Sequence, residues 1–196
     1  MISKNFSCVI AIALQENLLE TIANKNKDAF IINIKKINTL LHHADMSGLP
    51  IYYTQFVNPI TAYSEVMSES VIFGSTELLF TPKNSDMLFG ASNYGLSDAL
   101  LSQLKELVTT SGLPVLLVGV EADAFVLGAC FSLWNAEIPF KVSGKHVISE
   151  SAEAQECAFP IIVRQFMALD MEVENLMVAR SFTTNDKLVS TIGLPT

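Results

Sequence analysis

Charged residues are scarce in this chain, and basic residues are scarcer than acidic ones. Only 16% of the 196 residues are charged while 50% are hydrophobic, and 12 Lys and Arg face 20 Asp and Glu, a net charge of -8. Nucleic acids and anionic membranes are bound by basic surfaces, so this balance argues against both as partners. So few charges also leave more apolar surface than a monomer usually exposes, and we expect a homodimer or a larger homo-oligomer.

Cysteine and histidine are nearly absent as well. The three cysteines, Cys8, Cys130 and Cys157, cannot all pair and show no CxxC spacing, which argues against a disulfide framework or a structural zinc site. With only three histidines, no metal site is expected. The chain contains neither GxGxxG nor GxxxxGK[ST], so no phosphate loop and no cofactor are predicted. A reducing cytoplasm is the expected location.

Long hydrophobic runs are missing too. No run approaches the ~18 residues that a membrane helix requires. Lys4 and the apolar run from Cys8 to Leu14 loosely resemble the start of a signal peptide. The run is short and continues into the amphipathic segment QENLLETI, so a buried first strand is the better interpretation.

What the chain does contain is an alternation of strand and helix signals. Strands are predicted at Cys8 to Leu14, Ile51 to Gln55, Val115 to Val120, about Ile138 to Val142 and about Val173 to Ala179, with short ones at Ser70 to Phe73 and Glu77 to Phe80. Helices are predicted at Asp28 to Met46, Ser97 to Val108, Ala124 to about Asn135 and about Ser151 to Leu169. The alternation predicts one domain over residues 1–196, an α/β three-layer sandwich whose mostly parallel sheet has helices on both faces.

The irregular connection over residues 56–93 is where a lid or specificity loop would lie.

The stretch from Pro114 to Trp134 predicts the position of a site. Its apolar strand is interrupted by Glu121, Ala122 and Asp123, and Asp123 is the predicted N-cap of the following helix. Ligands bind beyond the carboxyl ends of the strands in open α/β sheets, so residues 121–126 would lie on the rim of a site. Phe125 is expected to face that site or to lie beside it.

Three segments, in the right order, resemble motifs of the isochorismatase-like cysteine hydrolase superfamily. The first strand and Gln15 resemble a strand that ends in Asp-x-Gln. GASNYGLSDAL, residues 90–100, resembles Lys-x-x-x-Ser-Ala-Phe-x-x-Thr-x-Leu, and VGVEADAFVLGA, residues 118–129, resembles Gly-Val-x-Thr-Asp-x-Cys-Val. The resemblance extends over nearly the full length and implies the α/β three-layer fold of that superfamily.

The resemblance also implies where catalytic residues would stand. Amide-hydrolysing members use an Asp, a Lys and a Cys, in which a thiolate attacks the carbonyl, a carboxylate moves the proton and an ammonium lowers the thiol pKa. In this chain the Asp falls on Ala13, the Lys on about Leu88 and the Cys on Phe125. Members that cleave vinyl ethers need the Asp as proton donor, which Ala13 also removes. We therefore expect no cysteine hydrolase activity, and a protein that binds a small ligand or forms oligomers.

Two alternatives remain open. One is an active hydrolase that uses a relocated acid, Glu16 or Glu121, with a serine or Tyr94 from residues 90–97, although a surface charge or a turn hydrogen bond explains either glutamate more simply. The other is a protein-interaction module for a different partner. The remaining candidates for the rim of a pocket are Gln15, Ala122 and Asp123.

Other conspicuous residues have structural interpretations. Cys130 is predicted to belong to the core because it lies in an apolar helix. His42 and His43 lie near the C-terminus of a helix, where a cation suits the helix dipole. His146 is expected just after a strand. Trp134 and most of the twelve phenylalanines fall at core spacing, so an aromatic stacking platform is not expected.

Overall fold

The structure is a computed structural model of the chain. It describes residues 2, 5–25, 27–58, 63–64, 70–73, 76–79, 88–91, 94–171 and 173. Most of the predicted lid connection, and the predicted last strand apart from Val173, lie outside these residues. No helix in the described ranges is long and apolar enough to cross a membrane.

Helices and strands alternate as the sequence predicts. The strands are β1 (Cys8–Ile12), β2 (Ile51–Asn58), β3 (Tyr63–Ser64), β4 (Ser70–Phe73), β5 (Thr76–Leu79), β6 (Leu88–Ala91), β7 (Val115–Val120), β8 (Phe140–Ile148) and β9 (Leu169–Asp170). The helices are α1 (Glu16–Lys25), α2 (Lys27–Met46), α3 (Asp98–Ser111), α4 (Leu127–Asn135) and α5 (Ala152–Ile161). Two π-helical turns, η3 (Ala122–Val126) and η4 (Ile162–Phe166), precede α4 and follow α5.

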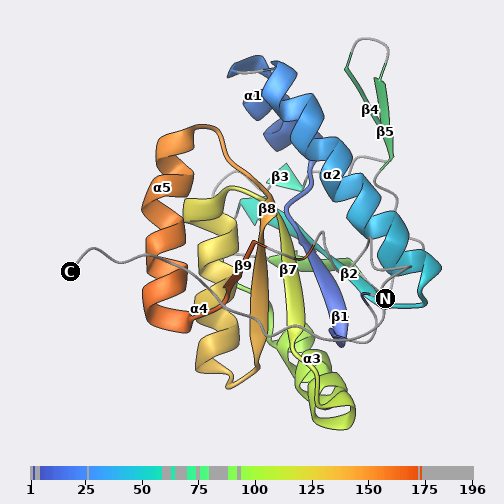
Figure 1. Cartoon of the computed structure of the whole chain (residues 1–196), viewed down its shortest axis with the longest axis vertical. Helices are drawn as coiled ribbons and strands as arrows, with labels where there is room; N and C mark the ends of the chain where they lie inside the picture. Colours follow the sequence, from blue (N-terminus) through green and yellow to red (C-terminus); the bar gives the residue numbers. More distant parts are fainter. Residues whose placement is uncertain are drawn as a thin grey trace, which may run out of the picture.

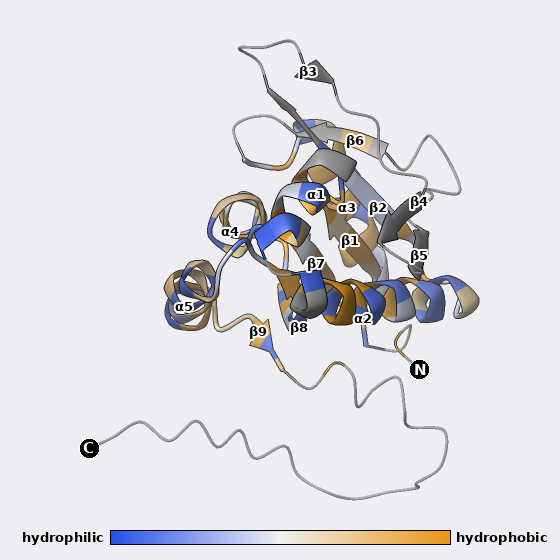
Figure 2. Cartoon of the chain, turned by 90° about the horizontal axis from the view of Figure 1, so that it is seen from above, coloured by the Kyte–Doolittle hydropathy of each residue, from blue (hydrophilic) through white to orange (hydrophobic). Residues whose placement is uncertain are grey.

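The main sheet is seven-stranded, in the order β3-β2-β1-β7-β8-β9 with β6 also paired to β2. Every pairing within it is parallel except that of β3 with β2. Helices α4 and α5 lie on one face of the sheet and α2 lies on the other (Figure 2). The three-layer α/β sandwich is therefore confirmed.

The centre of the sheet is the core of the molecule. All residues of β1 and β7 are buried, as expected for parallel strands covered on both faces. Gly119 of β7 has a φ of 138°, and a Cβ there would collide with the backbone oxygen of Ile12. Only glycine allows β1 and β7 to approach this closely, and their ends therefore meet side by side.

Several predicted boundaries are wrong. The first strand ends at Ile12 because Ala13 has a φ of 50°, which breaks the extended conformation. The strand predicted near Ile138 to Val142 is β8, which runs on to Ile148 because a register shift against β7 lets it continue past Gly144. His146, expected after a strand, is a buried residue of β8.

The helix predicted from Ser151 to Leu169 is also too long. Helix α5 starts after its N-cap Ser151 and ends at Ile161, directly after Pro160, and η4 follows it. Pro160 has no amide N–H and so cannot donate the backbone hydrogen bond of a regular helix. The turn then ends in the left-handed conformation of Met167, with a φ of 51°, and the chain enters β9.

Two further differences concern strands and aromatic side chains. Strand β6 is absent from the prediction, and the short strands β4 and β5 pair only with each other in an antiparallel hairpin. Phe131 and Trp134, expected at core positions, are exposed. Cys130 is buried as predicted.

Candidate functional site

The candidate site lies at the edge where the parallel strands β1, β2, β6 and β7 have their carboxyl ends, called here the carboxyl edge. Helix α1 follows β1 within a few residues and lies at this end of the sheet (Figure 1). Open parallel sheets bind ligands at this edge. The structure brings most of the predicted rim residues here, because they follow β1 and β7.

Ala13 is the residue that follows β1, at the position where the family resemblance places an aspartate. It is buried, and its backbone N–H donates to both the carbonyl oxygen and the Oγ1 of Thr54, at 3.1 and 3.3 Å. These bonds to β2 hold the left-handed backbone, which costs an alanine about 1–2 kcal/mol. The position therefore presents a methyl group and no acid.

Gln15 and Glu16 connect β1 to α1. Gln15 is buried, and its backbone oxygen accepts from the N–H of Leu19 at 2.9 Å, which starts the helix. It is therefore an internal residue and not the open rim residue that was expected. Glu16 is the first residue of α1, and its side chain lies outside the described residues.

Leu88, near the position where the family resemblance places a lysine, opens β6. Its backbone pairs with Tyr53 of β2, and Tyr53 pairs with Ala11 of β1. Leu88 therefore lies level with Ala11 in the sheet, across β2, two residues before Ala13. Its backbone is inside the sheet and not at the carboxyl edge. Its side chain lies outside the described residues.

Phe125, at the position where the family resemblance places a cysteine, lies in the π-helical turn η3 after β7. The backbone oxygen of Glu121 accepts from the N–H groups of Ala124 and Val126, at 3.3 and 3.0 Å, and closes the turn. The N-cap position is Glu121, which makes no capping bond through its side chain. The predicted N-cap Asp123 is therefore wrong: it lies one residue inside the turn and is exposed.

Ala122 explains why this turn needs no carboxylate cap. Its N–H donates to the Oγ of Ser149, at 3.0 Å, so a serine from the segment after β8 satisfies one of the open N–H groups at the start of the turn. Ala122 itself is fully buried. It is therefore part of the core and not of an open rim.

The ring of Phe125 is 7% exposed and packs against the half-exposed ring of Tyr94. The ring centroids are 5.1 Å apart and the planes are inclined by 34°, a geometry within the favourable range for aromatic pairs. Tyr94 comes from the segment that precedes α3 and has a φ of 63°. Two aromatic rings from distant segments thus meet where the resemblance would place a nucleophile.

The segment that carries Tyr94 is fixed to α4. A Cβ on Gly128 would collide with the backbone oxygen of Tyr94, so glycine is required for this approach. The Oγ of Ser132 accepts from the N–H of Leu96 at 3.0 Å and donates to the oxygen of Gly128, also at 3.0 Å. These contacts hold the Tyr94 ring over Phe125.

The carboxyl group of Glu121, at this edge, is partly buried and lies near another carboxylate. Burial, reinforced by the nearby Asp123 carboxylate, raises its pKa to about 7, while Lys25 acts in the opposite direction. Lys25 itself forms an ion pair with Glu150, which links the end of α1 to the segment after β8. A carboxyl that exchanges a proton near neutral pH can act as an acid or a base.

The cysteines do not supply a nucleophile to this edge. Cys8 begins β1 at the opposite end of the strand, and Cys130 lies inside α4. Burial raises the pKa of both thiols to about 12, so both remain protonated at neutral pH. Cys157 is exposed on α5.

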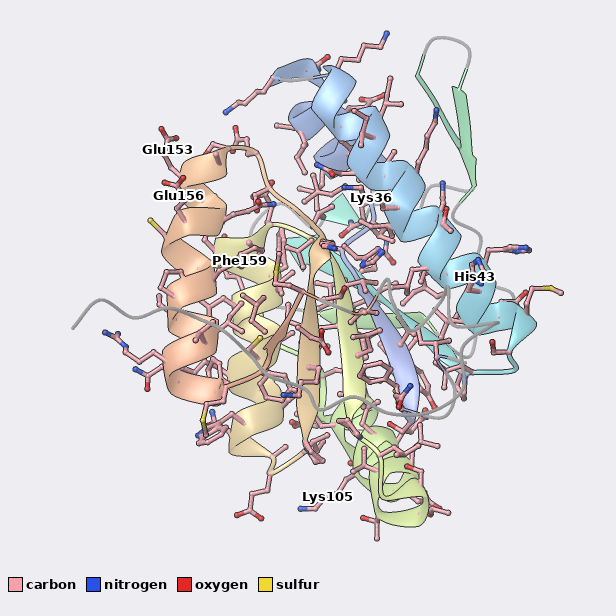
Figure 3. All side chains as sticks on the ribbon, viewed as in Figure 1. Lys36, His43, Lys105, Glu153, Glu156 and Phe159 are labelled. Atoms are coloured by element: carbon pink, nitrogen blue, oxygen red, sulfur yellow. The ribbon has the colours of Figure 1, made fainter. Side chains whose placement is uncertain are left out.

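The histidines lie elsewhere. His42 and His43 are exposed near the end of α2, and Figure 3 shows His43 projecting from that helix. His146 is buried in β8, where its Nδ1 and the Oγ of Ser143 share a hydrogen bond of 2.6 Å. Within the described part of the chain, no group of three or more His, Cys, Asp or Glu residues could hold a metal ion.

No family model and no curated protein matches the sequence, but solved structures match the fold. A MAR1 ribonuclease from Caenorhabditis elegans superposes with a TM-score of 0.60 at 18% identity, covering 89% of this chain and 80% of that one. An isochorismatase-like hydrolase from Alkaliphilus metalliredigens gives 0.61 at 12% identity, with 87% and 96% covered. A nicotinamidase from Bacillus subtilis gives 0.53 at 16% identity, with 83% and 97% covered. The protein therefore has the α/β fold of the isochorismatase-like hydrolases.

Proposed function

We propose that this protein has no thiol-dependent hydrolase activity and binds an uncharged small molecule at its carboxyl edge. The observation that carries this proposal is the buried Phe125 ring, packed against Tyr94 at the position that corresponds to the nucleophile. A hydrolase of this type needs a thiolate, a carboxylate and an ammonium to act together. Ala13, Leu88 and Phe125 provide none of these groups.

The expected loss of rate is large. Removing one member of a catalytic unit lowers kcat by several orders of magnitude, and removing the remaining members lowers it little further. The three cysteines offer no replacement, because two are buried with a raised pKa and the third lies on α5.

The proposed ligand follows from the groups at the edge. Tyr94 is half-exposed and its ring packs against that of the apolar Phe125. Ala13, at the end of β1, is also apolar. Such a surface favours a flat, uncharged molecule that stacks on an aromatic ring.

The test is an assay of the purified protein with nicotinamide, pyrazinamide and isochorismate, with a nicotinamidase of the same fold as the positive control. We expect product formation no faster than with heat-denatured protein. Thermal shift against planar amides and acids tests the binding part, with Tyr94→Ala as the matched variant that should lose any shift. Turnover by the wild-type protein would contradict the first part, and a shift that persists in Tyr94→Ala would contradict the second.

A second candidate function is hydrolysis with Glu121 as a relocated acid or base. The observation that favours it is the pKa of about 7 of this carboxyl, at the edge where substrates bind in this fold. If the wild-type protein turns over any substrate, Glu121→Gln should abolish that turnover and remove a limb of the pH profile near 7. Unchanged turnover in this variant would exclude Glu121 from the mechanism.

Ribonuclease activity is a further possibility, because the nematode protein that shares this fold is named a ribonuclease. RNA binding draws on basic surfaces, whereas this chain carries a net charge of -8. We expect no cleavage of a labelled single-stranded RNA under the same assay conditions, and cleavage by the wild-type protein would overturn this expectation.

A further inference from the structure

Helix α1 crosses the carboxyl edge of the sheet. It follows the end of β1 directly, and its last residue, Lys25, forms an ion pair with Glu150, which follows β8. Strand β7 lies between β1 and β8, so α1 passes over the end of β7 (Figures 1 and 2). The length fits, because a helix of 10 residues is about 15 Å long and two strands separated by a third are about 10 Å apart.

One face of α1 is packed against the rest of the molecule. Leu19, Ile22 and Ala23 are buried, at the spacing that places them on one side of a helix. Helix α1 also packs against α2. The helix is thus held over the edge by apolar contacts in its second half and by an ion pair at its end.

Glu121 lies at the end of β7, beneath this crossing. Its backbone N–H donates to the oxygen of Ile148 at 2.9 Å, and the N–H of Ala122 donates to the Oγ of Ser149 at 3.0 Å. These bonds attach the segment that carries Glu150 to the end of β7. Lys25 is therefore near both carboxyl groups, and its charge acts on that of Glu121.

Few other charges act on the Glu121 carboxyl. Those that do belong to Asp123, in the same turn, and to Lys25. The elements that pack against η3 are β7, β8, α4 and α5, and β7 carries no titratable side chain. The remaining titratable side chains on these elements are Glu153, Glu156 and Cys157 of α5, Cys130 of α4, and Lys141, Lys145 and His146 of β8.

We propose that α1 is a strap over the carboxyl edge, fastened by the Lys25–Glu150 ion pair, that opens when Glu121 loses its proton. Burial disfavours a carboxylate, whereas water around an open edge stabilises it. Burial is the largest influence on this carboxyl and outweighs the attraction of Lys25, so ionisation favours the open strap. Its use as a gate rests on the proposed ligand site, but the opening itself does not.

Hydrogen exchange of the full chain, measured by mass spectrometry without any ligand, tests the opening. Helix α1 should exchange before β7, because the strap opens while the sheet stays folded. After correction for the intrinsic effect of pH on exchange, the open fraction of α1 should rise by about tenfold or more from about pH 5 to pH 8.

Three variants separate the strap from a general effect of charge. Glu121→Gln stays neutral and should keep α1 protected at both pH values. Lys25→Met removes the fastening and should raise the open fraction about two- to fivefold at both, as expected for an exposed ion pair. The control is Lys105→Met, the same loss of charge on an exposed residue of α3 far from α1 (Figure 3), which should change nothing in α1.

Three results would overturn the proposal. The first is exchange of α1 only together with β7, since the helix would then open only when the whole fold does. The second is an equal rise with pH in the wild type and in Glu121→Gln, and the third is an equal effect of Lys25→Met and Lys105→Met. A failure of ligand binding leaves all three measurements unchanged, because no ligand is present in them.

Discussion

At the scale of single residues, the most consequential one is Phe125. The family resemblance places a nucleophile at this residue, and here its ring is almost completely buried against Tyr94. A catalytic group at this turn would have to be reached by a substrate, whereas a packed ring contributes hydrophobic burial. Phe125 thus stabilises the fold at a position where the family resemblance would place a nucleophilic side chain.

Phe125→Ala should lower the free energy of unfolding by about 3 kcal/mol, because it removes buried apolar surface and leaves a cavity. Urea unfolding at fixed pH measures this loss. The matched control is Phe131→Ala, whose ring is half-exposed and whose removal should cost clearly less. Equal losses in the two variants would show that the Phe125 ring is not packed as described.

Glu121 predicts a pH dependence of stability. Its pKa rises from 4.5 to about 7 on folding, so between these values the folded state binds more protons than the unfolded state. Its contribution to stability is therefore full below pH 4.5 and is lost as the pH rises through about 7. Glu121→Gln removes this loss, so the variant should gain stability relative to the wild type between about pH 5 and pH 8.

Urea midpoints at about pH 5 and pH 8 provide the measurement. Glu153→Gln, on an exposed carboxylate of α5 (Figure 3), is the control, and its stability should fall with pH as that of the wild type does, because it keeps Glu121. If the stability of Glu121→Gln relative to the wild type rises between about pH 5 and pH 8 no more than that of this control, the raised pKa is refuted.

At the scale of elements, the candidate site depends on how the segment before α3 is attached to α4. Gly128 allows the backbones to touch and Ser132 bonds both of them, while Ser97 caps α3 by accepting from the N–H of Leu100 at 3.3 Å. The position of Tyr94 therefore depends on contacts between elements and not on its own helix or strand.

Ser132→Ala should lower the free energy of unfolding by about 1–2 kcal/mol, because the partly buried N–H of Leu96 loses its acceptor. Urea unfolding measures this, with Thr109→Ala as the control. The hydroxyl of Thr109 only bonds the oxygen of Lys105 on an exposed helical surface, and its removal should cost little. A Ser132→Ala variant as stable as this control would mean that the bond does not hold the segment.

At the scale of the whole molecule, the chain is one α/β sandwich whose candidate site lies where the parallel strands end. The carboxyl edge carries Ala13, Glu121 and Phe125. The low charge content of the chain predicts self-association.

Self-association predicts a mass in solution that exceeds that of one chain. Sedimentation velocity at micromolar concentration should give a value above 21.4 kDa, because so few charges leave apolar surface that a second copy can cover. A species of 21.4 kDa at every concentration would contradict this prediction.

The sequence by itself determined the elements whose signal is local. Strand β7 and helix α2 lie within one residue of their predicted bounds, because a buried strand and an amphipathic helix each show their own periodicity. The order of these elements, with three motif-like segments, was enough to predict the α/β sandwich. The absence of reactive residues at Ala13, Leu88 and Phe125 is likewise visible in the sequence.

Only the tertiary structure decided how those residues are used. The full length of β8 depends on its register against β7, the left-handed turn at Ala13 depends on Thr54 of the neighbouring strand, and the contact of Tyr94 with Phe125 depends on Gly128 and Ser132. The exposure of Trp134 depends on what packs around α4. These features arise from contacts between segments far apart in the chain, which no local pattern encodes.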